Sequence, residues 1–310
     1  MPNVAERQVN LNHTVEGQHL AFGAPRIKNF QILTNGTLID DRVADRLAEI
    51  KNLTVQVSID AEDPAAHDAI RGRGSYARTM NAVRLLQGRG VLVTMSFTGA
   101  KGNSCQMPGF FNLCSKLNID EIRVDFVKAV GRAADNGNAA CLDEAEFLEA
   151  QRELNRLHEK YDWRFASPFD DRVATLGMFA KPRVHCGAGV TMVFIDADGN
   201  VYPCTSLDYP SQLGGNIRDK SLKEIFYESD AFKAIRSFDI NTVGACRDCF
   251  LKYICNGGCW IDGYANCGNF APSVHCETYK KLAEEKILEY ASDPSRMPPI
   301  PKTELKSVTP

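Results

Sequence analysis

Cysteine is the residue type in this 310-residue chain whose number and spacing indicate chemistry. The chain has 11 cysteines, and only Cys105, Cys114 and Cys141 precede residue 186. The others are concentrated in residues 186–276: Cys186, Cys204, Cys246, Cys249, Cys255, Cys259, Cys267 and Cys276. Thiolates are soft ligands that bind zinc, Cu(I) or iron–sulfur clusters. This set is large enough for two sites of four thiolates each, holding either zinc or a [4Fe–4S] cluster.

The cysteines follow two patterns. One is Cys246-x2-Cys249-x5-Cys255-x3-Cys259 with Cys276 further on, and the other is Cys186-x12-Gly199-x4-Cys204. Short spacings let a chain wrap one metal centre. C-x2-C pairs are typical of zinc sites, whereas a run with a distant extra cysteine is typical of ferredoxin-like ligation. Both interpretations stay open on spacing alone. Disulfides are disfavoured, because the N-terminus has no apolar segment like that of a signal peptide and a reducing cytoplasm is expected.

Charge and hydropathy exclude several classes of function. Lys and Arg number 36 against 39 Asp and Glu, which gives a formal net charge of −3. A nucleic-acid-binding protein would normally carry a basic face. No run of about 18 apolar residues is present, so no membrane-spanning helix is expected. The length leaves room for about two domains.

The elements that must position this chemistry begin with a β-α alternation. Strands are predicted at residues 29–33, 54–59, 91–97 and 122–127, and helices at 40–50, 77–87 (capped by Ser75), 108–117 and 143–160. Such an order predicts a parallel sheet covered by helices. Functional residues of parallel sheets lie at the carboxyl ends of the strands. Thr34-Asn35-Gly36 and Ser58-Ile59-Asp60 fall at such ends.

The pattern of the sequence changes after residue 186. Ala197-Asp198-Gly199-Asn200 is a hairpin signal between two short apolar runs. Ser221 is expected to cap a short helix, and further helices are predicted at 231–238 and 277–291. The cysteine-rich segment between them has little periodicity, so its fold is expected to depend on what the thiolates bind.

At this point the residues resemble a known family. The two cysteine patterns together are similar to the SPASM domain of radical SAM peptide-modifying enzymes, a family that includes sulfatase-maturase-like enzymes and ribosomal peptide maturases. Thr34-Asn35-Gly36, Val57-Ser58-Ile59-Asp60, and then His67-Asp68, Arg71-Gly72 and Ser75-Tyr76, stand in the order of that family's barrel. The resemblance covers about residues 29–285.

The resemblance implies an α/β fold with a partial (β/α) radical SAM barrel of about four β-α units, followed by a SPASM iron–sulfur domain. The expected organisation is an irregular N-terminus at 1–28, the partial barrel at 29–165, the SPASM domain at 166–285, and a helix end with a proline-rich tail at 286–310.

The same resemblance implies two auxiliary [4Fe–4S] clusters. Cys246, Cys249, Cys255 and Cys276 would ligate the second cluster, and Cys186, Cys204 and Cys259 the first. The family's fourth ligand to the first cluster stands six residues after the first cysteine, where this chain has Met192. The first cluster would then have an open iron site, or Cys267 would fill it. The alternative for Cys267 is a buried free thiol.

For the barrel, the resemblance implies that Asn35, Ser58, Asp60 and Arg71 lie near S-adenosylmethionine. A carboxylate or hydroxyl can bind the ribose, and a guanidinium can pair with the methionine carboxylate. The alternatives are strand-end capping for Ser58 and Asp60, and a surface ion pair with Asp68 or Glu62 for Arg71. His67 is expected to be a structural hydrogen-bonding residue.

The chain departs from the family in one large respect. Radical SAM enzymes carry Cys-x3-Cys-x2-Cys after their first strand and Gly-Gly-Glu after the second, and neither motif occurs here. Only 28 residues precede Asn29, whereas two further β-α units need about 60. We therefore expect an N-terminally incomplete member that is inactive alone, with a peptide or protein substrate and an electron donor such as flavodoxin or ferredoxin. The alternatives are a non-catalytic two-cluster electron-transfer or peptide-binding accessory protein, and a zinc-stabilised domain.

Overall fold

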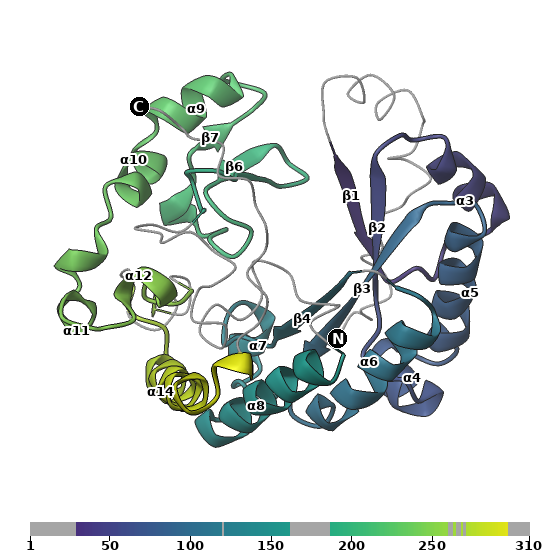
Figure 1. Ribbon diagram of the computed structural model, residues 1–310. Coiled ribbons are helices and arrows are strands. Elements are labelled where there is room, and N and C mark those ends of the chain that lie inside the picture. Colours follow the sequence, from purple (N-terminus) through teal and green to yellow (C-terminus); the bar gives the residue numbers. More distant parts are fainter. Residues whose placement is uncertain are drawn as a thin grey trace. The chain divides into compact units, whose positions relative to one another are not determined.

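The computed structural model describes residues 29–119, 121–161, 187–259, 263–264, 268 and 271–296 (Figure 1). The described residues form two compact units, 29–126 with 157–161, and 127–156 with those from 187 onward. The expected boundary at residue 165 stays a prediction, although the segment 127–156 groups with the second unit. The expected irregular N-terminus and most of the proline-rich tail lie outside the described residues.

The first unit contains a four-stranded parallel sheet in the order β1-β2-β3-β4. Its strands are Phe30–Thr34, Leu53–Ser58, Leu92–Gly99 and Ile122–Phe126. Thr34 pairs with Val57, and Ser58 pairs with Ser96. The predicted parallel sheet with the architecture of a partial barrel is therefore confirmed.

The two faces of this sheet differ in chemistry. Helices α3 (Asp41–Ala48), α5 (Ser75–Gln87) and α6 (Met107–Lys116) lie on one side of it (Figure 1). Side chains alternate along strands and paired residues share a face. One face is accordingly apolar and buried (Val55, Val57, Met95, Phe97), and the other is polar (Gln31, Gln56, Ser58, Thr94, Ser96). Helices on one side only are the arrangement of a barrel wall rather than of a doubly wound sheet.

Capping residues explain where the helices of the first unit begin. The Asp40 side chain accepts from the Val43 N–H at the start of α3. Helix α4 (Pro64–Arg71) was not predicted, although Asp63 caps it and Pro64 occupies its first turn, a pair that favours helix starts. The predicted capping role of Ser75 is wrong. Gly74, with φ 74°, is the N-cap of α5, and the Ser75 hydroxyl donates to Asp68 instead.

The second unit has little regular structure. Its three-stranded antiparallel sheet consists of β5 (Phe194–Ile195), β6 (Asn200–Tyr202) and β7 (Gly215–Asn216), and the predicted hairpin is confirmed. Ser221 caps α9 through the reciprocal bonds of a capping box with Glu224, as predicted. The remaining α-helices are α7 (Arg132–Asp135), α8 (Glu144–Lys160, which both units share), α10 (Asp230–Arg236), α11 (Gly244–Arg247), α12 (Lys252–Cys255) and α14 (Cys276–Ser292).

Short 3-10 turns occur at η2 (Ser104–Gln106), η3 (Pro210–Gln212), η4 (Ile240–Thr242) and η5 (Pro294–Arg296). Within the part of the chain that the structure describes, no helix combines the length and the apolar character needed to cross a membrane.

Candidate functional site

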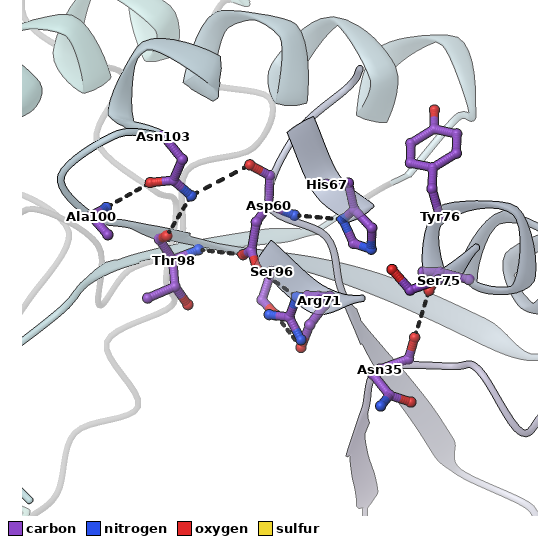
Figure 2. A network of polar contacts seen from close by, with 12 residues as sticks. Asn35, Asp60, His67, Arg71, Ser75, Tyr76, Ser96, Thr98, Ala100 and Asn103 are labelled. Atoms are coloured by element: carbon purple, nitrogen blue, oxygen red, sulfur yellow. Dashed lines mark hydrogen bonds and ion pairs between the residues drawn. The ribbon is translucent and has the colours of Figure 1, made fainter. Parts of the chain in front are cut away.

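Asp60 is the centre of a buried polar network just beyond the end of β2 (Figure 2). Its side chain is only 4% exposed. One carboxylate oxygen, Oδ2, accepts from Arg71 Nε at 2.5 Å, and the other, Oδ1, accepts from the Thr98 N–H at 3.3 Å. The carboxylate therefore joins the end of β2 to α4 and to β3.

His67 forms a hydrogen bond with the backbone of Asp60. The imidazole Nδ1 accepts from the Asp60 N–H at 3.2 Å, and the ring is fully buried. Burial, with the nearby Arg71 charge as the second cause, lowers the pKa of His67 below its usual 6.5. The ring is therefore neutral at pH 7, with its proton on Nε2. The expected structural role of His67 is confirmed.

Asn103 completes the network, and sequence reasoning missed it. Its Oδ1 accepts from the Ala100 N–H at 2.7 Å, and its Nδ2 donates to the Thr98 and Asp60 carbonyls at 3.0 and 3.4 Å. The residue is buried. The available signal was Gly102-Asn103, a turn dipeptide that follows a predicted strand, because asparagine side chains commonly bond the backbone of turns.

Arg71 pairs with a different residue from the two considered from sequence. The expected alternative, a surface pair with Asp68 or Glu62, is wrong. Asp68 instead accepts from the Gly74 and Tyr76 N–H groups at the start of α5, and these bonds, that from Tyr76 foremost, lower its pKa. Glu62 accepts from Lys116 at 3.0 Å and from Asn112 at 2.9 Å.

The geometry leaves the two Nη atoms of the Arg71 guanidinium available to bind a ligand. Its Nε is bound to Asp60, and within the described residues neither Nη has a hydrogen-bond partner. The side chain is 26% exposed. A guanidinium fixed on one edge and open on the other is suited to bind a carboxylate.

Ser58 and Asn35 lie at the ends of neighbouring strands. The Ser58 hydroxyl accepts from Ser96 Oγ at 3.4 Å on the polar face of the sheet. The Asn35 carbonyl accepts from Thr79 Oγ1 at 2.7 Å, and its side chain accepts from the Thr37 N–H at 3.0 Å. The following Gly36 has φ 76°, as its turn chemistry predicted. Contact of Asn35, Ser58, Asp60 or Arg71 with S-adenosylmethionine stays a prediction.

In the second unit, four cysteines influence one another electrostatically. Burial, followed by the charges of Cys276 and Cys246, raises the pKa of Cys255 to about 11. Burial and then the charges of Cys276 and Cys249 likewise raise the pKa of Cys246. Cys249 and Cys255 both pack against buried Leu251, Leu282 and Ala283. These four thiols are the set expected to ligate the second cluster.

Two other cysteines share a different apolar cluster. Cys204 and Cys259 both pack against buried Leu207 and Ile235. Their expected partner Cys186 and the ambiguous Cys267 lie outside the described residues. The backbone N–H of Met192 donates to the Gly187 carbonyl at 3.1 Å, and the Met192 side chain is exposed.

Within the described ranges, no three His, Cys, Asp or Glu side chains converge closely enough to hold one ion. Cys105 is exposed, and Cys114 is buried in α6, where burial raises the pKa of its thiol. Cys114 is thus a core residue, as expected.

Comparison with known proteins identifies the family. Residues 6–107 match the model of the radical SAM superfamily, and residues 186–250 match SPASM, described as an iron-sulfur cluster-binding domain. The chain belongs to the radical SAM/SPASM family. The resemblance was expected to start at about residue 29, whereas the radical SAM match begins upstream of it, at residue 6.

Relatives of this radical SAM/SPASM chain include the mycofactocin maturase MftC of Mycolicibacterium smegmatis, 30% identical over 73% of this chain. The AdoMet-dependent heme synthase of Methanosarcina barkeri is 24% identical over 77% of it. The chain spans 57% of the length of the first and 71% of the second.

Among solved structures, anSMEcpe with bound AdoMet and a Kp18Cys peptide superimposes with a TM-score of 0.71. The match covers 92% of this chain and 81% of that one, at 17% identity. At that identity the likeness confirms the fold.

The Asp60–Arg71 pair makes a prediction about stability. Asp60→Asn keeps the shape but removes the charge that faces Arg71, and breaking a largely buried pair is costly. Because Arg71 retains some access to water, we expect a loss of about 2 kcal/mol in the free energy of unfolding of the first unit. Urea unfolding of the variant and parent chains measures it.

Glu62→Gln is the matched control, because it breaks the more exposed pair with Lys116. Exposed pairs contribute roughly 0–1 kcal/mol. Equal losses in the two variants would contradict a special role for the Asp60 network.

Proposed function

We propose that this chain is the cluster-carrying part of a radical SAM/SPASM enzyme that modifies a peptide or protein, and that it binds two auxiliary [4Fe–4S] clusters. The observation that carries the proposal is that Cys249 and Cys255 pack against one apolar cluster, whereas Cys204 and Cys259 pack against another. The family match at residues 186–250, which includes Cys204, Cys246 and Cys249, supports iron–sulfur chemistry in this region.

Cys246, Cys249, Cys255 and Cys276 are proposed to hold the second cluster. Burial and neighbouring charges raise the pKa of Cys246, Cys255 and Cys276, and a cationic iron–sulfur core would stabilise their thiolates. Four thiols that influence one another electrostatically suit a [4Fe–4S] cluster, whose four irons each take one ligand. Such a cluster supplies electron transfer.

Cys186, Cys204 and Cys259 are proposed to hold the first cluster. Cys204 and Cys259 come from distant parts of the sequence and pack on one apolar cluster, which supports their pairing. Met192 stands at the family position of the fourth ligand. The fourth iron of this cluster therefore takes its ligand from Cys267 or from outside the protein.

Asn35, Ser58, Asp60 and Arg71 are proposed to line the S-adenosylmethionine site at the end of the parallel strands. The open edge of Arg71 would bind the methionine carboxylate. Asp60 is buried and already bound to Arg71, so we assign it to holding that guanidinium rather than to binding ribose.

The partners follow from the family and from cluster chemistry. A peptide is bound in the anSMEcpe structure, and we propose a peptide or protein substrate here. A reducible cluster needs an electron donor, such as flavodoxin or ferredoxin. Thiolates must stay reduced to ligate iron, so we place the protein in the cytoplasm.

A second candidate function is a non-catalytic accessory protein that carries two clusters and transfers electrons or binds peptides. One observation favours it: within these 310 residues no cysteine precedes Cys105, so the sequence contains no Cys-x3-Cys-x2-Cys. We infer that these residues alone do not cleave S-adenosylmethionine.

Metal analysis tests the cluster proposal. After anaerobic preparation we expect about eight iron per chain, because two [4Fe–4S] clusters hold four each. The exposed Cys105 lies outside both groups, so Cys105→Ser is the control and should keep the full iron content. About two zinc and no iron would show a zinc-stabilised domain instead.

Reductive cleavage tests the catalytic inference. The reconstituted 310-residue chain, incubated with dithionite and S-adenosylmethionine, should release no 5′-deoxyadenosine above the protein-free rate. A relative that carries Cys-x3-Cys-x2-Cys serves as the positive control in the same assay. Release at an enzymatic rate would contradict the inference.

A further inference from the structure

The C-terminal helix α14 begins at one of the proposed cluster ligands. Cys276 is its first residue, and Lys280 follows four residues later. Residues four apart lie on the same face of a helix, about one turn from each other. The Lys280 ammonium donates to Glu277 Oε1 at 2.8 Å, which keeps the amine beside the first turn of the helix. Its side chain is 33% exposed.

The same helix packs against the other proposed ligands. Leu282 and Ala283 of α14 belong to the buried apolar cluster that Cys249 and Cys255 contact, and Tyr279 also packs against this apolar cluster. Lys280 therefore directly follows Tyr279, a residue that packs against the same apolar cluster as Cys249 and Cys255.

We propose that Lys280 raises the reduction potential of the cluster held by Cys246, Cys249, Cys255 and Cys276. This inference rests on the proposed function. Reduction adds one electron from the donor to the cluster and makes the site more negative, with no bond formed or broken in the protein. A fixed positive charge close by stabilises the reduced form.

Acidic side chains also lie near the start of α14, so Lys280 offsets negative charge beside the proposed cluster. Glu277 is the next residue after Cys276, and Glu144 of α8 lies close enough that its Oε1 accepts from Thr278 Oγ1 at 3.4 Å. Both carboxylates therefore lie at the end of α14 that begins with Cys276. Without Lys280, the charges next to this end of the helix would be negative, and they would disfavour reduction.

The test compares Lys280→Gln with Lys281→Gln in reconstituted full-length chains. Both variants remove one positive charge from adjacent positions, but Lys281 is exposed and Lys280 is half-buried. A reductive titration followed by electron paramagnetic resonance measures each potential. The signal of this cluster is the one absent from the double variant Cys249→Ala, Cys255→Ala.

Lys280→Gln should lower the equilibrium constant for one-electron reduction by about tenfold, which is about 59 mV. Lys281→Gln should lower it by less than about threefold. Glu277→Gln should shift the potential in the opposite direction, because it removes a negative charge and leaves Lys280 in place.

Iron content, measured on the same samples, separates the two possible failures. A parent chain without iron would overturn the proposed function. A parent and a Lys280→Gln variant with equal iron but the same potential would overturn the role of Lys280. Equal shifts in Lys280→Gln and Lys281→Gln would also overturn it, because they would show only an effect of net charge.

Discussion

Burial of several thiols that repel one another is the constraint on which the second unit depends. Ionised Cys246, Cys255 and Cys276 would each be disfavoured by burial and by their neighbours. The surrounding structure offers little to offset that cost, because its strands have only two or three residues. A bound cluster, as proposed, would resolve the conflict by neutralising the thiolates and by cross-linking the segments that carry them. Metal binding and folding should therefore be coupled in this unit.

The first unit is stabilised differently. Its parallel sheet has a buried apolar face under helices, and hydrogen bonds connect polar residues at the strand ends. Asp60 connects β2 to α4 through Arg71 and to β3 through Thr98, while His67 and Asn103 bind its backbone. The network fixes Arg71 with one edge open. The arginine at the end of α4 is thus held as a preoriented donor of hydrogen bonds, as recognition of an anionic group requires.

Much of this could be predicted from periodicity and cap residues. The alternation of strands and helices, the hairpin at Gly199 and the cap at Ser221 are local properties, and local sequence predicted them. Helix α4 was missed, although Asp63-Pro64 marked its start. The partner of Arg71 was missed because the choice between Asp60, Glu62 and Asp68 depends on how α4 packs, which no spacing reveals. Spacing likewise did not divide the cysteines into groups; the family resemblance did, and the shared apolar clusters support that division.

The most direct test of the two-group account is the distribution of iron between paired variants. Cys249→Ala with Cys255→Ala should remove one cluster, and Cys204→Ala with Cys259→Ala the other, so each pair keeps about half of the parent iron. Their low-temperature paramagnetic resonance spectra should be different and should add up to the parent spectrum. If both pairs lost the same spectral component, or if either kept all of the iron, the division of the thiols into two cluster sites would be contradicted.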